Sequence, residues 1–419
     1  MNSGRLATGL LVAWIAGAAA GSASGSSERA TGLDRLLSPA REPVLRVGVR
    51  VGVPSIEVGS ASGLLLSDGQ TGRVLGAVGP GETLRVSRHG PGLSAAGDQL
   101  RDAGTVHVLR IETSGTDPVR IDGSPYRGRF ELLAVEDSVV TAVNIVSLED
   151  YLLGVVPLEI GPRTREELAA IEAQAVAART YAVAHLDGHI EMGFDLFGTV
   201  EDQVYGGIDA ERQESTDAVR ATAGRILTHD GLPIRAYYHS TCGGRTAAID
   251  EVLDRPAAPY LQSVSDQAPD GSDWCSISPR YRWSSNWSSD QLNGPVRDEL
   301  ARMFGEQPGT LGPIDGFRVI DHTESGRIRS VAFFGPGSEF VLERLDIRFA
   351  LRDSDGRILG STDFDVVPEG GGEYSVHGRG FGHGAGMCQW GAIGRARAGQ
   401  TSAEILSAYY PGTRLSRVY

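Results

Sequence analysis

A change in hydrophobic periodicity near residue 160 is the feature that most constrains the fold of this 419-residue chain. Residues 44–53 read VLRVGVRVGV, and apolar side chains at alternate positions are typical of a half-buried strand. The segments HVLRIET, RFELLAV and SVVTAVNIVSL repeat this alternation. Residues 164–186 instead carry apolar side chains at helical spacing, after a capping pair formed by Thr164 and Glu167. The sequence therefore predicts an α+β fold, with a β-rich first part and a mixed α/β part that contains a long helix.

The first residues have the pattern of a secretory signal peptide. An apolar run from Leu6 to Ala20 follows one arginine and ends in small residues, and the run is too short to span a membrane. We expect a signal peptide at 1–23 and a polar linker at 24–42. The β-rich domain is expected at 43–135 and the mixed, catalytic region at 136–419. The mature protein is thus expected to be secreted or to lie in the periplasm or cell envelope.

The charge balance argues against one class of partner. The chain has 39 basic and 53 acidic residues and a formal net charge of −14, so nucleic acid is not an expected partner. A hydrophobic content of 41% and scattered charges indicate a globular protein with an extensive core.

Three cysteines, Cys242, Cys275 and Cys388, leave two interpretations open. In an oxidising compartment we expect one disulfide and one free thiol. A zinc site built from these cysteines and a histidine is the alternative. The spacing contains no C-x-x-C pair, which favours the disulfide but does not decide between them.

Glu159 stands in the segment LEDYLLGVVPLEI, which we interpret as the end of a strand running into an apolar turn. Its neighbours are Leu158 and Ile160, and Pro157 precedes them. Burial raises the pKa of a carboxyl group, which suits a general acid that works near neutral pH. A solvated acid in a surface loop is the alternative, and the local sequence alone favours it.

Arg179 and a glycine-striped segment are further candidates for contact with a ligand. Arg179 lies inside the expected helix and needs an acceptor, which could be Glu159, an anionic substrate group or a structural ion-pair partner. In the segment VHGRGFGHGAGMCQWGA every second residue from 378 to 386 is glycine. If this segment is extended, one face is bare backbone, which serves either ligand binding or close packing of strands.

Six blocks in this chain together resemble the stage II sporulation protein D family (SpoIID/LytB). They run in the family's order from about residue 135 to the end: VNIVSLEDYLLGVVPLEI, EAQAVAARTYAVAH, YHSTCGGRT, SISPRYRW, GRGFGHGAGMCQWGA and EILSAYYPGT. One departure is EIGPRT, which lengthens the usual connection between the acid and the following helix.

The resemblance implies a lytic transglycosylase that acts on peptidoglycan glycan strands lacking stem peptides, with Glu159 as the catalytic acid. It also implies that several residues lie near the substrate: Arg179, His239, Ser240, Thr241, His383, Gln389 and Tyr410. No cofactor is required by this activity, although some members of the family bind zinc. Other members enhance cell-wall amidases, so a non-catalytic glycan-binding module or amidase enhancer is an alternative, and a metal-dependent hydrolase that uses the cysteines and histidines is another.

Overall fold

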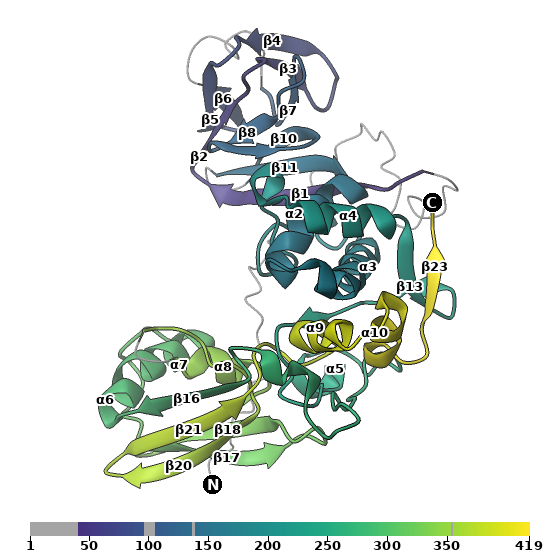
Figure 1. The fold of residues 1–419 in the computed structure, drawn as a ribbon. Coiled ribbons are helices and arrows are strands. Elements are labelled where there is room, and N and C mark those ends of the chain that lie inside the picture. Colours follow the sequence, from purple (N-terminus) through teal and green to yellow (C-terminus); the bar gives the residue numbers. More distant parts are fainter. Residues whose placement is uncertain (1–40, 96–104, 136–138, 353–354) are drawn as a thin grey trace. The chain divides into compact units, whose positions relative to one another are not determined.

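The computed structural model describes residues 41–95, 105–135, 139–352 and 355–419. The expected signal peptide at 1–23 and nearly all of the expected linker at 24–42 lie outside these residues. The described chain forms two compact units, which we describe separately (Figure 1). The N-unit comprises the described residues up to Ala236 together with Arg414–Tyr419, and the C-unit is Tyr237–Thr413. The chain therefore divides at 236/237, inside the region expected to be one catalytic region.

The N-unit contains two larger sheets, with strand orders β12-β1-β11-β10-β7-β3-β4 and β6-β5-β2-β8-β9. Only the β1–β12 pair is parallel among the described pairs of these sheets. The strands are β1 (Val44–Val53), β2 (Ser55–Gly59), β3 (Leu64–Asp68), β4 (Val74–Val78), β5 (Thr83–His89), β6 (Gly92–Ala95), β7 (Val108–Thr113), β8 (Val119–Ile121), β9 (Ser124–Tyr126), β10 (Arg129–Ala134), β11 (Val140–Ser147) and β12 (Leu196–Phe197). The alternation predicted for residues 44–53 is present from Leu45 to Val49, after which register shifts interrupt it.

The first helix of the N-unit follows β11 without a loop. Helix α2 (Leu148–Ile160) begins after Ser147, whose hydroxyl accepts the backbone N–H of Asp150, and it packs against α3 (Leu168–Ala184) and α4 (Gln213–Ala221). Figure 1 shows these helices gathered beside β1 and β11. LEDYLLGVVPLEI is therefore a helix and not a strand end with a turn. Its residues are buried nearly all round, so no periodicity distinguishes the two structures.

The helix predicted from Thr164 onward is confirmed. A short turn, η1 (Arg165–Glu167), precedes α3, and the Glu167 carboxylate accepts the backbone N–H of Thr164 at 3.0 Å. The remaining elements of the N-unit are η2 (Ile190–Met192), η3 (Gly207–Ala210), β13 (Arg225–His229), β14 (Leu232–Pro233) and β23 (Arg414–Arg417). Strands β14, β13 and β23 form a small antiparallel sheet, so the last residues of the chain pair with its middle.

The C-unit contains three small sheets, β15-β22, β16-β21-β20 and β17-β18-β19. Its strands are β15 (Tyr238–His239), β16 (Arg282–Trp287), β17 (Gly316–His322), β18 (Ile328–Gly335), β19 (Ser338–Glu343), β20 (Phe364–Gly370), β21 (Glu373–Arg379) and β22 (Met387–Cys388). Its helices are α5 (Ile249–Val252), η4 (Trp274–Ile277), α6 (Ser289–Gln291), η5 (Leu292–Val296), α7 (Arg297–Met303), α8 (Asp346–Ala350), α9 (Gln389–Arg397) and α10 (Ser402–Tyr409). Trp287, Phe317 and Phe333 lie in one buried cluster between these elements.

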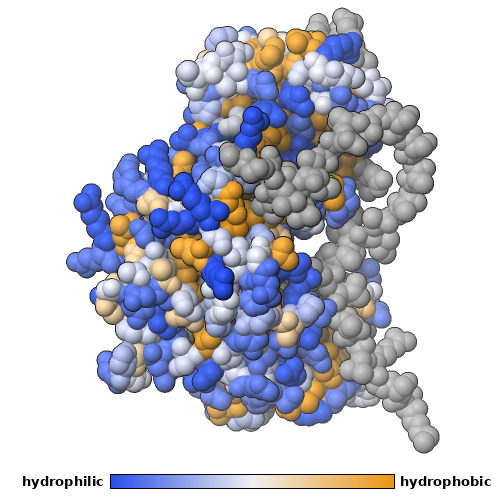
Figure 2. Space-filling view, turned by 90° about the vertical axis from the view of Figure 1, so that its right-hand side faces the viewer, coloured by the Kyte–Doolittle hydropathy of each residue, from blue (hydrophilic) through white to orange (hydrophobic). Residues whose placement is uncertain are grey.

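The surface carries apolar residues in scattered positions. Figure 2 shows one face, on which hydrophobic residues lie singly or in small groups among hydrophilic ones. Within the described ranges, the structure contains no helix with the length and apolar character that crossing a membrane demands. The observed mixture of helices and sheets confirms the α+β fold class.

Candidate functional site

Glu159 is the next-to-last residue of α2 and is half-buried. Its Oε1 accepts the backbone N–H of Val204 at 3.0 Å, which ties the carboxylate to the chain between β12 and η3. The preceding side chain, Leu158, is 45% exposed, so this end of α2 reaches the surface of the N-unit. Glu159 is thus a partly exposed carboxylate on a rigid helix end and not a freely solvated acid in a loop.

The loop that contacts Glu159 is fixed by residues that the sequence analysis did not single out. Asp202 accepts hydrogen bonds from the Tyr181 hydroxyl at 2.9 Å and from the Phe197 backbone N–H at 2.8 Å, and it pairs with His189 Nε2 at 3.2 Å. Gln203 is fully buried and accepts the Tyr151 hydroxyl at 3.3 Å. These bonds hold the loop so that Val204 reaches Glu159. In the sequence these residues are a polar pair, Asp202 and Gln203, before Val204. Such a pair indicates a loop but not the contacts that the loop makes.

Arg179 has a structural place in the N-unit. Its side chain is fully buried, and its Nε and Nη2 donate to the two carboxylate oxygens of Glu149 at 2.7 and 2.8 Å. It also donates to the backbone carbonyls of Ala175, Val219 and Arg225. Of the three acceptors considered for Arg179, the structure contains the structural ion pair, and its partner is Glu149 and not Glu159. This burial contradicts the substrate-facing position that the family resemblance implies. Because the guanidinium of Arg179 has no exposed surface, it cannot contact a sugar.

The glycine-striped segment is not an extended strand beyond Arg379. Gly380, Gly382, Gly384 and Gly386 all have positive φ, so the chain loops between β21 and β22. At Gly386 an added Cβ would lie 2.0 Å from the carbonyl oxygen of Tyr237, so this position needs both the left-handed backbone and the bare face. Of the two interpretations of the bare backbone, the structure supports close packing.

The glycine-rich loop packs against the HST segment, residues 239–241. Thr241 and Phe381 exchange backbone hydrogen bonds of 2.9 and 2.7 Å, and Met387 donates its N–H to the Tyr237 carbonyl. The structure therefore brings together His239, Ser240, Thr241, His383, Gln389 and Tyr410 in the C-unit. Glu159 and Arg179 belong to the N-unit.

The two histidines of this assembly are held neutral. His383 Nδ1 accepts the Ala385 backbone N–H at 3.1 Å, so its proton lies on Nε2, which donates to the Tyr238 carbonyl at 2.9 Å. Burial lowers the pKa of His383 to about 4, and the positive charges of Arg348 and Arg327 add to this effect. Burial, with His383 and Arg327 nearby, also holds the pKa of His239 well below its usual value. The rings lie 5.5 Å apart between centroids.

Most of the other predicted substrate residues are buried. Thr241 is 1% exposed and bonds to the Ser278 hydroxyl, and Tyr410 is fully buried and donates its hydroxyl to the Tyr237 carbonyl at 2.7 Å. Gln389 is also buried, at the start of α9. Ser240 and His383 stay partly exposed, together with three aromatic residues nearby in the sequence: Tyr237, Tyr238 and Trp390. Contact with a ligand is thus available to Ser240 and His383 but not to the buried hydroxyls.

Some buried polar atoms beside this assembly have no hydrogen-bond partner among the described residues. One is Nε2 of the neutral His239, which is an acceptor because Nδ1 donates to the Ala385 carbonyl at 3.1 Å. The others are the donors Nε and Nη1 of Arg327, whose Nη2 donates to the Cys242 carbonyl at 2.9 Å. Buried polar atoms without partners are rare and indicate a place for water or a ligand. The sequence contains no signal for Arg327, because an arginine just before a strand carries no distinguishing pattern.

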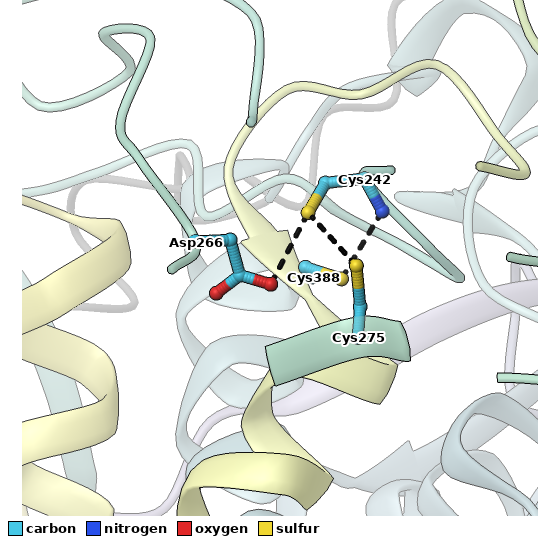
Figure 3. Close-up of side chains that lie close together, drawn as sticks. All are labelled: Cys242, Asp266, Cys275 and Cys388. Atoms are coloured by element: carbon cyan, nitrogen blue, oxygen red, sulfur yellow. Dashed lines mark hydrogen bonds between the residues drawn. The ribbon is translucent and has the colours of Figure 1, made fainter. Parts of the chain in front are cut away.

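The three cysteines lie together in the C-unit as free, buried thiols, although they are far apart in the sequence. Asp266, which the sequence analysis did not single out, completes the group, and no histidine belongs to it (Figure 3). Burial raises the pKa of Asp266 to about 7.

The family described as stage II sporulation protein matches residues 136–229, and a domain of unknown function matches residues 272–386. Stage II sporulation protein D of Bacillus subtilis is 30% identical over 290 residues, which cover 66% of this chain and 76% of that protein. The protein of the same name from Bacillus amyloliquefaciens is 30% identical over 327 residues, which cover 74% and 84%. An amidase enhancer of Bacillus subtilis is 28% identical over 350 residues, which cover 74% of this chain and 47% of the enhancer.

Fold and site define an α+β protein with a carboxylate at a helix end in one unit and a glycine-rich, cysteine-containing assembly in the other. The chain belongs to the stage II sporulation protein D family.

Proposed function

We propose that this protein remodels the bacterial cell wall as a lytic transglycosylase, with Glu159 as general acid and base, after export to the cell envelope. The family and its relatives support the cell-wall role, and the geometry of Glu159 supports the chemistry. The observation that carries the proposal is a half-buried carboxylate on a rigid helix end, anchored through Oε1 to the Val204 N–H.

The reaction needs one carboxyl group that first gives and then takes a proton. Glu159 protonates the oxygen that links MurNAc to GlcNAc while the bond from that oxygen to C1 breaks. The resulting carboxylate then removes the proton from the 6-hydroxyl of the same MurNAc, and that oxygen bonds to C1 to close a 1,6-anhydro ring. Because the nucleophile is already tethered to the sugar, no water and no second carboxylate are needed.

Glu159 lies at the C-terminal end of α2, and the last turn of this helix contains no basic residue. The Val204 N–H stabilises the carboxylate that forms after proton transfer.

The test is the Glu159→Gln variant on glycan strands stripped of stem peptides. Glutamine keeps the size and the acceptor for Val204 but donates no acidic proton, so release of anhydro products should fall roughly a hundred- to ten-thousandfold. Mass spectrometry of the products measures this rate. The matched control is Glu166→Gln, an exposed glutamate in η1 of the same unit, which should keep the wild-type rate. Anhydro products at the normal rate from Glu159→Gln would show that the acid is assigned wrongly.

The similarity to an amidase enhancer favours a second candidate, a glycan-binding module that stimulates a cell-wall amidase. In that case Glu159→Gln leaves stimulation of the amidase intact, and the wild-type protein releases no anhydro sugars. The two functions are therefore separated by one variant and two assays.

A further inference from the structure

Four ligand atoms converge inside the C-unit. They are the sulfurs of Cys242, Cys275 and Cys388 and a carboxylate oxygen of Asp266, and all lie within 4.8 Å of one another. Figure 3 shows the four side chains pointing toward a common centre from a loop, a second loop, η4 and the start of α9. The sulfurs of Cys242 and Cys275 are 3.5 Å apart, and Cys242 Sγ is 3.2 Å from Asp266 Oδ2. Around a tetrahedral zinc ion with Zn–S bonds of about 2.3 Å, neighbouring sulfurs lie about 3.8 Å apart.

The backbone around the sulfurs is arranged for thiolates. The N–H groups of Cys242 and Gly391 each donate to Cys388 Sγ at 3.2 Å, and Gly244 donates to Cys242 Sγ at 3.4 Å. Cys388 also caps α9, where the helix dipole favours negative charge. Several N–H donors directed at buried sulfurs stabilise charge on them, which neutral thiols do not require.

Asp266 is oriented by its own partners. Its Oδ1 accepts the Tyr409 hydroxyl at 2.6 Å and lies 3.4 Å from Arg395 Nη2, while Oδ2 faces the sulfurs. Metal-binding carboxylates are characteristically held in this way by a second layer of hydrogen bonds. Arg395 also offsets part of the negative charge of three thiolates and a carboxylate.

We propose that one zinc ion is bound here by Cys242, Cys275, Cys388 and Asp266. This closed structural site joins the chain just after the HST segment to η4 and α9. The thiol protons leave as the metal binds, and all four positions are filled by protein, so the ion has no open position for catalysis. A disulfide uses only two of the three sulfurs and gives Asp266 no role. A polynuclear iron–sulfur cluster spreads its ligands around several ions, whereas these atoms are close enough for one.

The first experiment measures metal and thiols in the full-length protein, purified without reductant from zinc-supplemented cells. Elemental analysis should find one zinc per chain. Denaturation in a chelator with an alkylating agent should then modify all three cysteines. One modified cysteine, a mass lower by two hydrogens and no zinc would establish a disulfide and overturn the proposal. Three free thiols without zinc would overturn it as well.

The second experiment uses two adjacent buried tyrosines. Tyr409→Phe removes the hydrogen bond to Asp266, and loss of such a partner should weaken zinc binding roughly ten- to a hundredfold in competition with a chromogenic chelator. Tyr410→Phe is the matched control, because its hydroxyl donates to the Tyr237 carbonyl and should leave zinc affinity unchanged. Equal affinities in both variants would contradict the assignment of Asp266 as a ligand.

Discussion

The two units present their candidate residues in opposite ways. In the N-unit, Glu159 lies half-buried at a helix end beside the exposed Leu158. In the C-unit, His239, Thr241 and Tyr410 are at most 4% exposed and bond to backbone or to a neighbouring hydroxyl. Residues from the same set of sequence blocks therefore differ in accessibility: Glu159 is partly exposed, whereas His239, Thr241 and Tyr410 are buried and bonded within the fold.

The units also differ in what maintains their geometry. The N-unit relies on an ion pair between the buried Arg179 and the partly exposed Glu149, which joins α3 to the start of α2. The C-unit relies on backbone approach between the glycine loop and the HST segment, and on the cysteine cluster.

The largest effect is expected from Arg179→Ala in the N-unit. This variant leaves the Glu149 carboxylate without its charged partner, so the free energy of unfolding should fall by about 3–5 kcal/mol. Urea denaturation followed by far-UV circular dichroism measures the loss. The control is Arg318→Ala, which breaks the exposed pair with Glu339 and should cost no more than about 1 kcal/mol. Similar losses from both variants would remove the distinction between the two pairs.

A smaller loss is expected from Gly386→Ala in the C-unit. Alanine at φ +70° would place its Cβ 2.0 Å from the Tyr237 carbonyl oxygen, so strain and displacement together should cost about 2–4 kcal/mol. Gly399→Ala measures the energetic cost of the left-handed backbone alone, because φ at this position is +84° and nothing lies within 4 Å of the added Cβ. That control should cost about 1–2 kcal/mol. If the two variants are equally stable, close packing is not the reason for Gly386.

The most gradual effect is the response to acid. His383, with its pKa lowered to about 4, and His239 stay neutral in the folded C-unit, while unfolded histidines take a proton near pH 6.5. The unfolded chain therefore binds more protons as the pH falls from 6.5 toward 4. Stability is complete above this window and falls within it by up to about 1.4 kcal/mol per pH unit for each histidine.

The N-unit should stay folded to a lower pH than the C-unit. Burial raises the pKa of Glu149, but the hydrogen bonds and charge of Arg179 outweigh it, and the net pKa lies below its usual value. Its stabilisation is thus lost only as the pH falls through that lowered value. All described tryptophans lie in the C-unit, so tryptophan fluorescence separates its unfolding from the total circular dichroism signal. His383→Asn should flatten the fluorescence-detected slope, and an unchanged slope would exclude His383 as a titrating group.

Local sequence patterns predicted elements well where a capping pair or an alternation marked them. Thr164 with Glu167 marks the start of the helical segment that contains α3, and the alternation after Val44 marks β1. The same patterns failed for α2, which is buried nearly all round and shows no periodicity. They also failed for the glycine segment, because alternate glycines are compatible with a strand or with a loop of positive φ.

The sequence by itself determined the family and the fold class and singled out Glu159 as the candidate acid, because ordered blocks and hydrophobic period are properties of the chain read in order. Only the tertiary structure decided that Arg179 pairs with Glu149 and that Asp266 stands with three distant cysteines. The physical reason is that a buried charge or thiolate is stabilised by whichever partners packing brings within about 4 Å, and sequence separation does not encode those distances.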